Sequence, residues 1–378
     1  MSGRPDAIVV GAGIVGAFCA RELAAAGLSV LVLERGIPAG ATTATGMGHL
    51  VVLDDSEAEM ALCAASLELW EALAPELPAV VEDEPRGTLW MAADEEEMAF
   101  LPAKRDTYRA RGLPAEILGP RELAEAEPAL APDLAGGLLV PRDRVLYPMS
   151  LVPWLLDRLA AEGSLLLRTG VEVAALDGAG VELADGERLE AGLVVNAAGP
   201  WAGELTPGLS IRPRRGHLVI TDRYPGMVNA QLVELGYLES AHQLTAESVA
   251  ANVQPRATGQ LLVGSSRELV GWDATINRPL LARMLARCRR YVPALARLSI
   301  LRIWVGFRPA TPDKLPYIGR MGEDGPWVAA GHEGLGITLA TGTARLLADL
   351  VLGRDPLVDP GPYDPSRPMP DAGREAAP

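Results

Sequence analysis

The chain begins with two apolar runs that flank a segment of helical periodicity. Residues Ala7–Val10 form a short apolar run typical of a buried parallel strand, and a second run, Ser29–Leu33, closes at Glu34. Between them a helical pattern extends to Gly27. The distribution of apolar positions therefore predicts a strand–turn–helix–strand unit over residues 7–34.

Three glycines in the predicted turn have the spacing of a dinucleotide-binding fingerprint. Gly11 permits the tight turn, Gly13 lets a pyrophosphate approach the backbone, and Gly16 lets helix and strand pack closely. The phosphates would lie at the helix N-terminus, where free N–H groups and the helix dipole favour anions. Glu34 follows Gly11 by 23 residues (34 − 11), where a carboxylate accepts hydrogen bonds from ribose hydroxyls. Because it would repel a 2′-phosphate, Glu34 argues against NADP.

The middle of the chain changes from an α/β to a largely β pattern. After a predicted helix over 56–73, short strands joined by Asp-Gly turns lead to a buried strand at 193–195 and a small-residue turn at 196–200. From 211 to about 300 strands dominate, and the clearest are 214–222, 249–256 and 259–266. We expect an antiparallel sheet in this region.

The C-terminal region returns to the α/β pattern. A strand over 327–330, a glycine turn over 331–336 and a helix over 337–352 repeat the arrangement at the N-terminus. The residues after Asp355 are rich in Pro and Asp and are expected to be extended or disordered. The pattern as a whole predicts an α/β fold, with a Rossmann-like dinucleotide-binding domain and a second domain built on an antiparallel sheet.

Composition narrows the choice of partners. The 378 residues are 49% hydrophobic, enough for a large core, and the formal net charge is −15. An acidic surface disfavours nucleic acids and anionic membranes, although this charge also serves simply to keep a protein soluble. The first residues lack the basic region of a signal peptide, and no run of about 18 apolar residues predicts a membrane span. Small molecules or proteins are the expected partners.

Three cysteines, Cys19, Cys63 and Cys288, are scattered without a CxxC pair. This excludes a disulfide framework, a zinc ribbon or an iron–sulfur site built from this chain alone, so any iron–sulfur relay would lie on another chain. Neither a nucleophile–base triad nor an HExxH motif is present. We expect no metal site and a cytoplasmic protein, with any membrane association made through a partner.

Four motifs occur in the order found in one enzyme family: GAGIVG, VVNAAGPWA, VGFRPATPDKLPYIGR and GHEGLGITLATGTARLL. In these motifs the chain resembles the D-amino-acid oxidase-like FAD oxidoreductases, which include glycine and sarcosine oxidases. The loop TGMGHLVVLDDS and the GHEGLG turn are most similar to the flavin subunit of D-hydroxyproline dehydrogenases. The resemblance implies an FAD domain assembled from residues 1–82, 141–211 and 302–378, and a substrate domain from 83–140 and 212–301.

The resemblance also implies which residues hold FAD. The glycine turn would hold the diphosphate, Glu34 and Arg35 the adenosine end, and the terminal turn the pyrimidine edge of the flavin ring, where a helix N-terminus stabilises developing negative charge. No cysteine falls in a flavin-facing motif, so FAD is expected to bind non-covalently. The cofactor-binding residues implied are Gly11, Gly13, Ile14, Val15, Gly16, Glu34, Arg35, Thr42, Thr43, Gly46, Met47, Gly48, Val173, Ala197, Ala198, Gly199, Trp201, Gly334, Leu335, Gly336, Ile337 and Thr338.

Four further residues are candidates for contact with substrate. Arg308 matches the family's carboxylate-binding arginine, against the alternative of an ordinary surface or ion-pair residue. Glu333 would hold the substrate's ammonium, or be a solvated loop carboxylate. Asn252 stands where glycine oxidase places a substrate-contacting tyrosine. His49 would face the ring or be structural, and His217 is expected near the ring.

Three functions remain open from the sequence. The first is FAD-dependent dehydrogenation of the C–N bond of a small D-amino or imino acid, D-hydroxyproline-like or D-proline-like, with electrons passed to a partner subunit or quinone. The second is the same oxidation with O2 as acceptor and release of peroxide. The third is a flavin-bearing structural subunit of a larger complex, which the retained Arg308 disfavours. An NAD-dependent enzyme is a weaker fourth possibility, because the terminal glycine–helix motif favours FAD as the cofactor.

Overall fold

The computed structural model describes residues 4–236 and 247–369. Strand β1 (Ala7–Val10) leads through the glycine turn into helix α1 (Ile14–Ala25) and strand β2 (Val30–Glu34), as the apolar pattern predicts. β1 pairs in parallel with β2 on one side and with β12 (Leu193–Asn196) on the other. Since β1 is covered on both faces, all four of its residues are buried and apolar.

β1 lies within a six-stranded sheet of order β18-β19-β12-β1-β2-β8. β8 (Leu165–Thr169) and β19 (Trp327–Ala330) extend the parallel arrangement, and β18 (Tyr317–Arg320) is an antiparallel edge. One apolar core joins residues of α1 to those of the other helices near it: α3 (Glu57–Leu73), α6 (Pro148–Ala161) and α10 (Gly336–Leu352). The dinucleotide-binding fold is thus built from distant parts of the chain.

A second sheet has eight strands in the order β17-β13-β16-β15-β14-β4-β6-β5. Neighbouring strands are antiparallel, as predicted, except that β14 and β4 run parallel. Helix α9 (Arg278–Tyr291) packs on β15 and β16. The strands are β4 (Thr88–Ala92), β5 (Glu116–Leu118), β6 (Gly136–Val140), β13 (Arg212–Thr221), β14 (Gln231–Glu234), β15 (Glu247–Pro255), β16 (Leu261–Glu268) and β17 (Ile300–Ala310).

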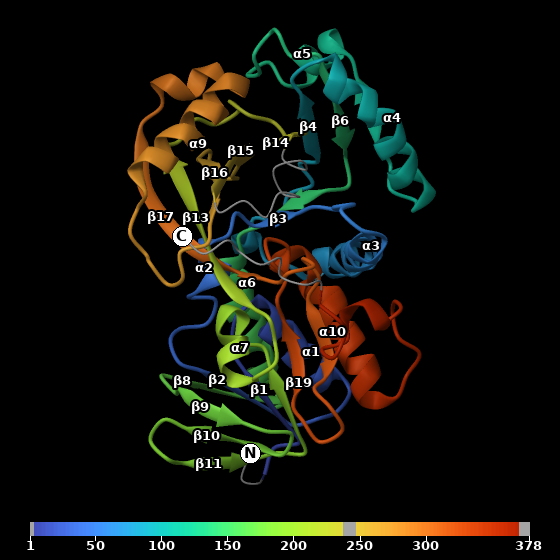
Figure 1. The fold of residues 1–378 in the computed structure, drawn as a ribbon, viewed down its shortest axis with the longest axis vertical. Coiled ribbons are helices and arrows are strands. Elements are labelled where there is room, and N and C mark those ends of the chain that lie inside the picture. Colours follow the sequence, from blue (N-terminus) through green and yellow to red (C-terminus); the bar gives the residue numbers. More distant parts are fainter. Residues whose placement is uncertain (1–3, 237–246, 370–378) are drawn as a thin grey trace.

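Further strands and helices surround the two large sheets. Two strands pair as a small ribbon, three form a separate sheet, and four helices connect or cover the larger sheets. They are β3 (His49–Leu50) with β7 (Arg144–Val145), then β9 (Val173–Leu176), β10 (Gly180–Leu183) and β11 (Arg188–Glu190), and α2 (Thr42–Thr45), α4 (Glu95–Ala110), α5 (Pro120–Ala126) and α7 (Ala202–Leu205). In Figure 1 the eight-stranded sheet lies above with α4, α5 and α9, while β1, β2 and α1 lie below.

Strand β17 crosses the implied domain boundary between residues 301 and 302. Its pairing with β13 runs without a break from Arg302 opposite Ile220 to Ala310 opposite Arg212. By strand pairing, residues 302–310 therefore belong to the eight-stranded sheet. No change of sequence pattern after residue 310 indicates that the sheet ends there. The other implied boundaries stay predictions.

The chain after Asp355 is packed as far as Met369, so the expectation of an extended or disordered segment is wrong there. Tyr363 is buried, and its hydroxyl donates to Ala58 O at 2.6 Å. Arg367 forms an ion pair with Asp313. The side chains of Tyr363 and Arg367 thus hold in place a segment whose composition suggests disorder. Residues 370–378 lie outside the described residues.

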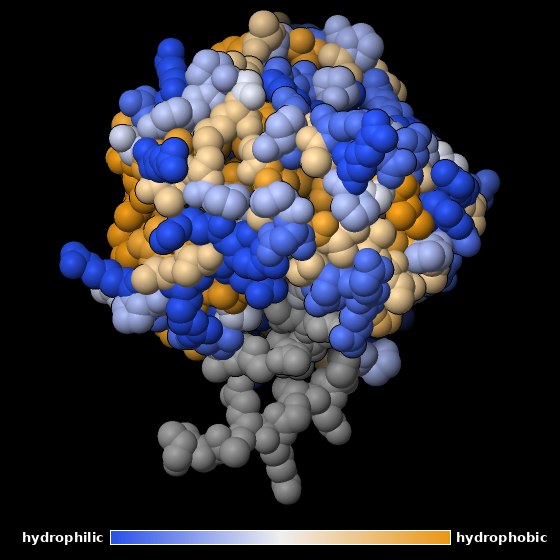
Figure 2. Space-filling model, turned by 90° about the horizontal axis from the view of Figure 1, so that it is seen from above, coloured by the Kyte–Doolittle hydropathy of each residue, from blue (hydrophilic) through white to orange (hydrophobic). Residues whose placement is uncertain are grey.

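Seen from the eight-stranded end, the surface mixes hydrophilic and apolar residues, and strongly hydrophobic residues are most evident at the left of the view (Figure 2). Within residues 4–236 and 247–369, no helix has both the length and the apolar character needed to cross a membrane.

Candidate functional site

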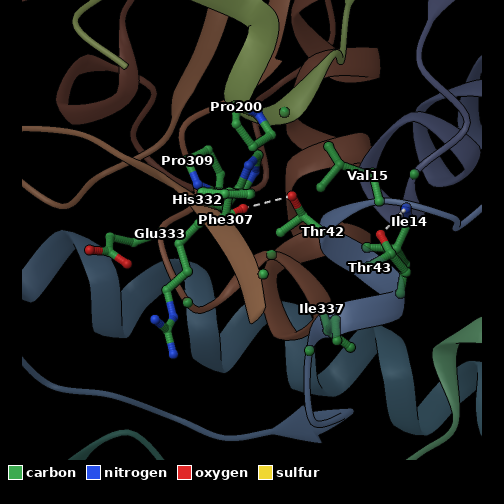
Figure 3. Close-up of a pocket in the computed structure, with 18 of the residues that line it drawn as sticks. Ile14, Val15, Thr42, Thr43, Pro200, Phe307, Pro309, His332, Glu333 and Ile337 are labelled. Carbon is green, nitrogen blue, oxygen red and sulfur yellow. Dashed lines mark hydrogen bonds between the residues drawn. The ribbon is translucent and has the colours of Figure 1, made fainter. Parts of the chain in front are cut away.

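A cavity of about 340 Å3 is lined by residues from both large sheets. From the six-stranded side come the start of α1, the end of β2 and the turn after β12, and from the eight-stranded side come residues of β13, β16 and β17. Ile14 and Thr43 lie at one side of the cavity, and Pro309 and Glu333 lie at the other (Figure 3). The cavity therefore connects the predicted dinucleotide turn with the predicted substrate residues.

The glycine turn leaves room at the N-terminus of α1. Gly11 has φ +105°, and a Cβ atom there would lie 2.6 Å from Ala197 O. At Gly13 the nearest atom to an added Cβ is Thr43 Oγ1, at 3.4 Å. The same Thr43 oxygen accepts a hydrogen bond from Ile14 N at 3.1 Å. The bare backbone and helix N-terminus facing the cavity fit a diphosphate.

The end of β2 holds a fixed carboxylate at the same cavity. Glu34 Oε2 accepts from Ala12 N and Oε1 from Gly36 N, both at 2.8 Å. The Arg35 guanidinium lies 3.9 Å from the centre of the Trp201 ring. Trp201 in turn stacks on Trp272, with centroids 4.7 Å apart. The carboxylate at this end suits the hydroxyls of a ribose, while Arg35 and Trp272 cover the two faces of the Trp201 ring.

The loop around α2 is fastened to the eight-stranded sheet. Thr42 Oγ1 donates to Phe307 O at 2.8 Å, a bond drawn in Figure 3. Gln254 Nε2 donates to Met47 O at 2.7 Å, and Trp304 Nε1 to Thr45 O at 3.3 Å. Strands β15 and β17 thereby hold this side of the cavity in place.

Two of the implied cofactor residues lie behind the lining. An added Cβ at Gly16 would lie 2.0 Å from Gly11 O, so Gly16 serves the packing of helix on strand. Thr338 Oγ1 accepts from Val51 N at 3.1 Å and donates to His49 O at 3.2 Å. Its side chain thus ties α10 to residues 49–51, and its implied place beside the flavin ring stays a prediction.

The other implied cofactor residues line the cavity together. At the end opposite the glycine turn, α10 begins at Gly336 and points its N-terminus toward the lining. The residues brought together are Gly11, Gly13, Ile14, Val15, Glu34, Arg35, Thr42, Thr43, Gly46, Met47, Gly48, Val173, Ala197, Ala198, Gly199, Trp201, Gly334, Leu335, Gly336 and Ile337. Two helix N-termini at the ends of one cavity fit a dinucleotide with an electron-accepting ring.

Arg308 lies on β17 and lines the cavity beside Gly334. Its Nη1 donates to Ser266 O at 3.0 Å, and its guanidinium occupies the space above Gly216. Arg308 is thus a cavity residue with a fixed orientation.

The Glu333 side chain is largely shielded from water and forms an ion pair with Arg214. Its Oε1 accepts from Arg214 Nη1 at 2.8 Å, and the two side chains are 13% and 6% exposed. Burial raises the pKa of Glu333, but the guanidinium groups of Arg214, Arg308 and Arg267 outweigh it, and the net effect is a lowered pKa. Its φ of +47° is unusual for a residue with a side chain and marks a position fixed by its contacts.

His49 and Asn252 also line the cavity, and each has a protein partner. His49 Nε2 is 2.8 Å from Thr88 Oγ1, and burial lowers the pKa of His49 to about 3, so the ring is neutral at physiological pH. Asn252 Oδ1 accepts from Gln231 Nε2. His49 lines the cavity and also contacts Thr88, so both expected roles, facing the ring and serving the structure, stay predictions.

His217 does not approach the cavity, contrary to expectation. It is fully buried, with Nδ1 2.8 Å from Ser266 Oγ and Nε2 accepting from Asn277 N at 3.0 Å. Strand alternation explains this, because its neighbours Gly216 and Leu218 line the cavity and His217 points to the opposite face.

Sequence reasoning missed Arg214, Arg267 and Lys314, which also line the cavity. Arg214 shares the face of Gly216 on β13, and this alternation is readable from the sequence. Arg267 depends on the pairing of β16 with β13, which no local pattern specifies. Lys314 forms an ion pair with Asp55 at 2.9 Å.

Among the described residues, no group of three or more His, Cys, Asp or Glu side chains is arranged to hold a metal ion.

This fold and cavity define an oxidoreductase that carries a dinucleotide cofactor. The family model for FAD-dependent oxidoreductases of the DAO type matches residues 6–350. Glycine oxidase of Pseudomonas aeruginosa is 31% identical over 388 aligned positions, covering 95% of this chain and 98% of that protein. The chain therefore belongs to the DAO family of FAD-dependent oxidoreductases.

Two further comparisons agree with this assignment. A D-amino acid dehydrogenase of Xanthobacter autotrophicus is 30% identical over 316 positions, covering 79% of this chain and 71% of that protein. The crystal structure of glycine oxidase from Geobacillus kaustophilus superposes with a TM-score of 0.86 at 28% identity, covering 98% of this chain and all of that one.

Proposed function

We propose that the protein oxidises the C–N bond of a small amino or imino acid whose carboxylate is bound by Arg308. The observation that carries this proposal is the position of Arg308: it lies at the cavity end formed by Gly334 and the start of α10, opposite the glycine turn. A guanidinium in a fixed orientation is suited to bidentate binding of a carboxylate. The similarity to glycine oxidase and a D-amino acid dehydrogenase supports the same chemistry.

The residues of the chain position the substrate. Arg308 would fix the carboxylate, since Ser266 O orients its guanidinium and Gly216 leaves space for it. Oxidation removes a hydride from the carbon and a proton from the nitrogen, so that a C=N double bond forms. FAD, which the two glycine–helix turns would hold, would supply the acceptor for the hydride when bound. The N-terminus of α10 and the buried walls would hold the reacting carbon close to it and exclude water.

Within this class, the sequence resemblance favours D-proline-like and D-hydroxyproline-like substrates, with electrons passed to a partner subunit or quinone. Oxidation by O2, as the name glycine oxidase implies for the relative, is the alternative acceptor. The substrate contacts described above are the same whichever molecule accepts the electrons. The two alternatives are therefore distinguished by identifying the electron acceptor, and not by a change at Arg308.

An anaerobic titration of the purified flavoprotein tests the proposal. Glycine, sarcosine, D-alanine, D-aspartate, D-proline and D-hydroxyproline would be added singly, and bleaching of the flavin absorbance recorded. At least one is expected to bleach it, and Arg308→Ala should lower kcat/KM about 100-fold while FAD content stays unchanged. No bleaching by any amine would contradict the proposal. A dehydrogenase is expected to turn over with an artificial dye as electron acceptor but not with O2. Peroxide formation at the turnover rate would instead identify O2 as the electron acceptor.

A further inference from the structure

His49 lines the end of the cavity where α10 begins. Strand β3, which carries His49, pairs with β7, and the His49 carbonyl accepts a hydrogen bond from Thr338 Oγ1 at 3.2 Å. Arg308 adjoins the same turn from the other sheet, since a Cβ atom added at Gly334 would lie 3.7 Å from its Nε. The imidazole and the guanidinium thus line one end of the cavity, beside residues 334–338.

One nitrogen of the His49 ring is bonded inside the protein. Nε2 is 2.8 Å from Oγ1 of Thr88, which is fully buried on β4. Nδ1 forms no hydrogen bond with any residue that the structure describes. Because burial lowers the pKa of His49 to about 3, the ring is neutral and carries a single N–H. The nitrogen that holds this hydrogen therefore determines whether Nδ1 can donate or accept.

A buried carboxyl group lies beside Thr88. Asp143 is fully buried, and neither of its oxygens has a close hydrogen-bond partner within residues 4–236 and 247–369. The Thr88 hydroxyl and the Val52 N–H are near enough to favour its ionised form. Since a carboxylate only accepts hydrogen bonds, it should attract the hydrogen of the Thr88 hydroxyl. The Thr88 oxygen is then left to accept from Nε2–H of His49, and Nδ1 keeps its lone pair.

We propose that His49 Nδ1 accepts a hydrogen bond from the N–H of the substrate, with Thr88 and Asp143 as positioning residues that fix this tautomer. The inference rests on the proposed function and adds the contact that holds the substrate nitrogen. Primary and secondary amines both have such an N–H. With the carboxylate on Arg308 and the nitrogen on His49, the reacting carbon has a defined orientation in the cavity. Because its ring is neutral, His49 orients the nitrogen and is not the base that removes its proton.

Protonation of Asp143 should reverse the tautomer. A protonated carboxyl group donates to Thr88, whose hydroxyl then donates to Nε2 of His49 and leaves the ring hydrogen on Nδ1. Burial raises the pKa of Asp143 to about 7. The form of His49 that accepts through Nδ1 therefore prevails above this pH and is lost below it, where Nδ1–H would face the N–H of the ligand.

The charged and titratable groups near Asp143 come from two helices and the segment before α3. Among the described residues they are Lys104 and Tyr108 from α4, Cys63 from α3, and Asp54. Lys104 is paired with Asp54, while burial keeps Tyr108 and Cys63 neutral by raising the pKa of each well above its usual range. Burial also raises the pKa of Glu59, another residue of the cavity lining, to about 7. A variant of Asp143 is therefore needed to separate the two carboxyl groups.

A matched pair of ligands tests the hydrogen bond. Pyrrole-2-carboxylate and furan-2-carboxylate share their shape and their carboxylate, but the first has an N–H where the second has an oxygen. Titrated into the holoenzyme at pH 8 and followed by the shift of the flavin absorbance, the pyrrole ligand should bind about tenfold more tightly. His49→Phe and Thr88→Val should each reduce this ratio to less than about threefold at unchanged FAD content. Thr107→Val, an exposed threonine on α4 outside the cavity lining, is the control.

The pH dependence of the same ratio separates positioning from a purely structural role. In the wild type the ratio should fall at least about threefold between pH 8 and pH 6, and Asp143→Asn should make it independent of pH. A ratio that still changes with pH in Asp143→Asn would assign the titration to Glu59 and overturn the role of Asp143.

The ligand pair also keeps this inference separate from the proposed function. A preference for the pyrrole ligand that is lost in His49→Phe supports the contact whether or not any amine bleaches the flavin. Equal affinity for the two ligands, or a ratio that His49→Phe leaves unchanged, overturns the inference. If Arg308→Ala still lowers kcat/KM for an amine in that case, the proposed function stands.

Discussion

A Cβ atom on Gly216 would lie 2.3 Å from Nη1 of Arg308. The space that glycine leaves on β13 is thus the space in which the Arg308 guanidinium lies. Ser266 O is also close, 2.8 Å from such a Cβ, and it accepts the hydrogen bond from Arg308. The absence of one side chain on β13 therefore determines the orientation of a side chain on β17.

Gly216→Ala should consequently impair substrate binding without removing FAD. The methyl group would displace the Arg308 guanidinium, and we expect kcat/KM for carboxylated amines to fall at least tenfold, mainly through KM. Steady-state kinetics with the flavin content of each preparation would measure this. Arg308→Lys is the matched comparison, since it keeps the positive charge but loses the two parallel N–H donors of the guanidinium. A Gly216→Ala enzyme with wild-type kcat/KM would show that Gly216 does not determine the orientation of Arg308.

Two glycines of the N-terminal turn should respond differently to the same substitution. Gly16→Ala places a Cβ 2.0 Å from Gly11 O, and overpacking of this kind costs about 1–3 kcal/mol, so the apoprotein should unfold at lower temperature. Gly13→Ala meets no protein atom closer than 3.4 Å and should leave the apoprotein melting temperature almost unchanged. Its methyl group would obstruct the diphosphate and weaken FAD binding at least tenfold.

Melting curves of the apoproteins and FAD titrations followed by flavin fluorescence would separate the two effects. Equal melting temperatures for both variants would show that Gly16 has no packing role. Unchanged FAD affinity in Gly13→Ala would place the diphosphate elsewhere.

A buried carboxyl group should make stability depend on pH. Burial raises the pKa of Asp143 to about 7 from an ordinary value of 3.8, against the opposing charge of Lys104. Between pH 4 and 7 the native state therefore holds a proton that the unfolded chain has lost, so this group's contribution to stability falls as pH rises. The difference approaches about 4 kcal/mol at most, since one pKa unit corresponds to about 1.4 kcal/mol.

Asp143→Asn removes this titration. We expect the free energy of unfolding of the variant, relative to wild type, to be higher at pH 8 than at pH 4.5. Urea unfolding of the two proteins at both pH values would measure the difference. A relative stability that is the same at the two pH values would show that Asp143 is ionised throughout.

The sequence predicted those parts of the site that depend on local pattern. The strand–turn–helix unit of residues 7–34 and the terminal turn before α10 are contiguous, and glycine spacing specifies both. Two sequence motifs indicate Arg308 and Glu333 as candidates, and both line the cavity. Arg267 and the orientation of His217 depend on how β13 pairs with its two neighbours, and this long-range pairing leaves no local mark in the sequence.

The fold shows the same division between local and distant information. The strands of the eight-stranded sheet were expected from their alternation, but the parallel pairing of β14 with β4 joins segments about 140 residues apart and could not be anticipated. Tyr363 and Arg367 likewise hold a proline-rich segment through contacts with Ala58 and Asp313, which composition does not reveal.

The hydrogen bond from Thr42 to Phe307 O connects the loop on the predicted ribityl side of the cavity to the residue preceding Arg308. Any ligand that steadies this loop also steadies the strand that carries the guanidinium. Occupancy of the two parts of the cavity is then thermodynamically linked, and linkage is reciprocal. Carboxylate ligands should slow the loss of FAD by strengthening its binding, and the factor by which they do so should equal the factor by which FAD strengthens theirs.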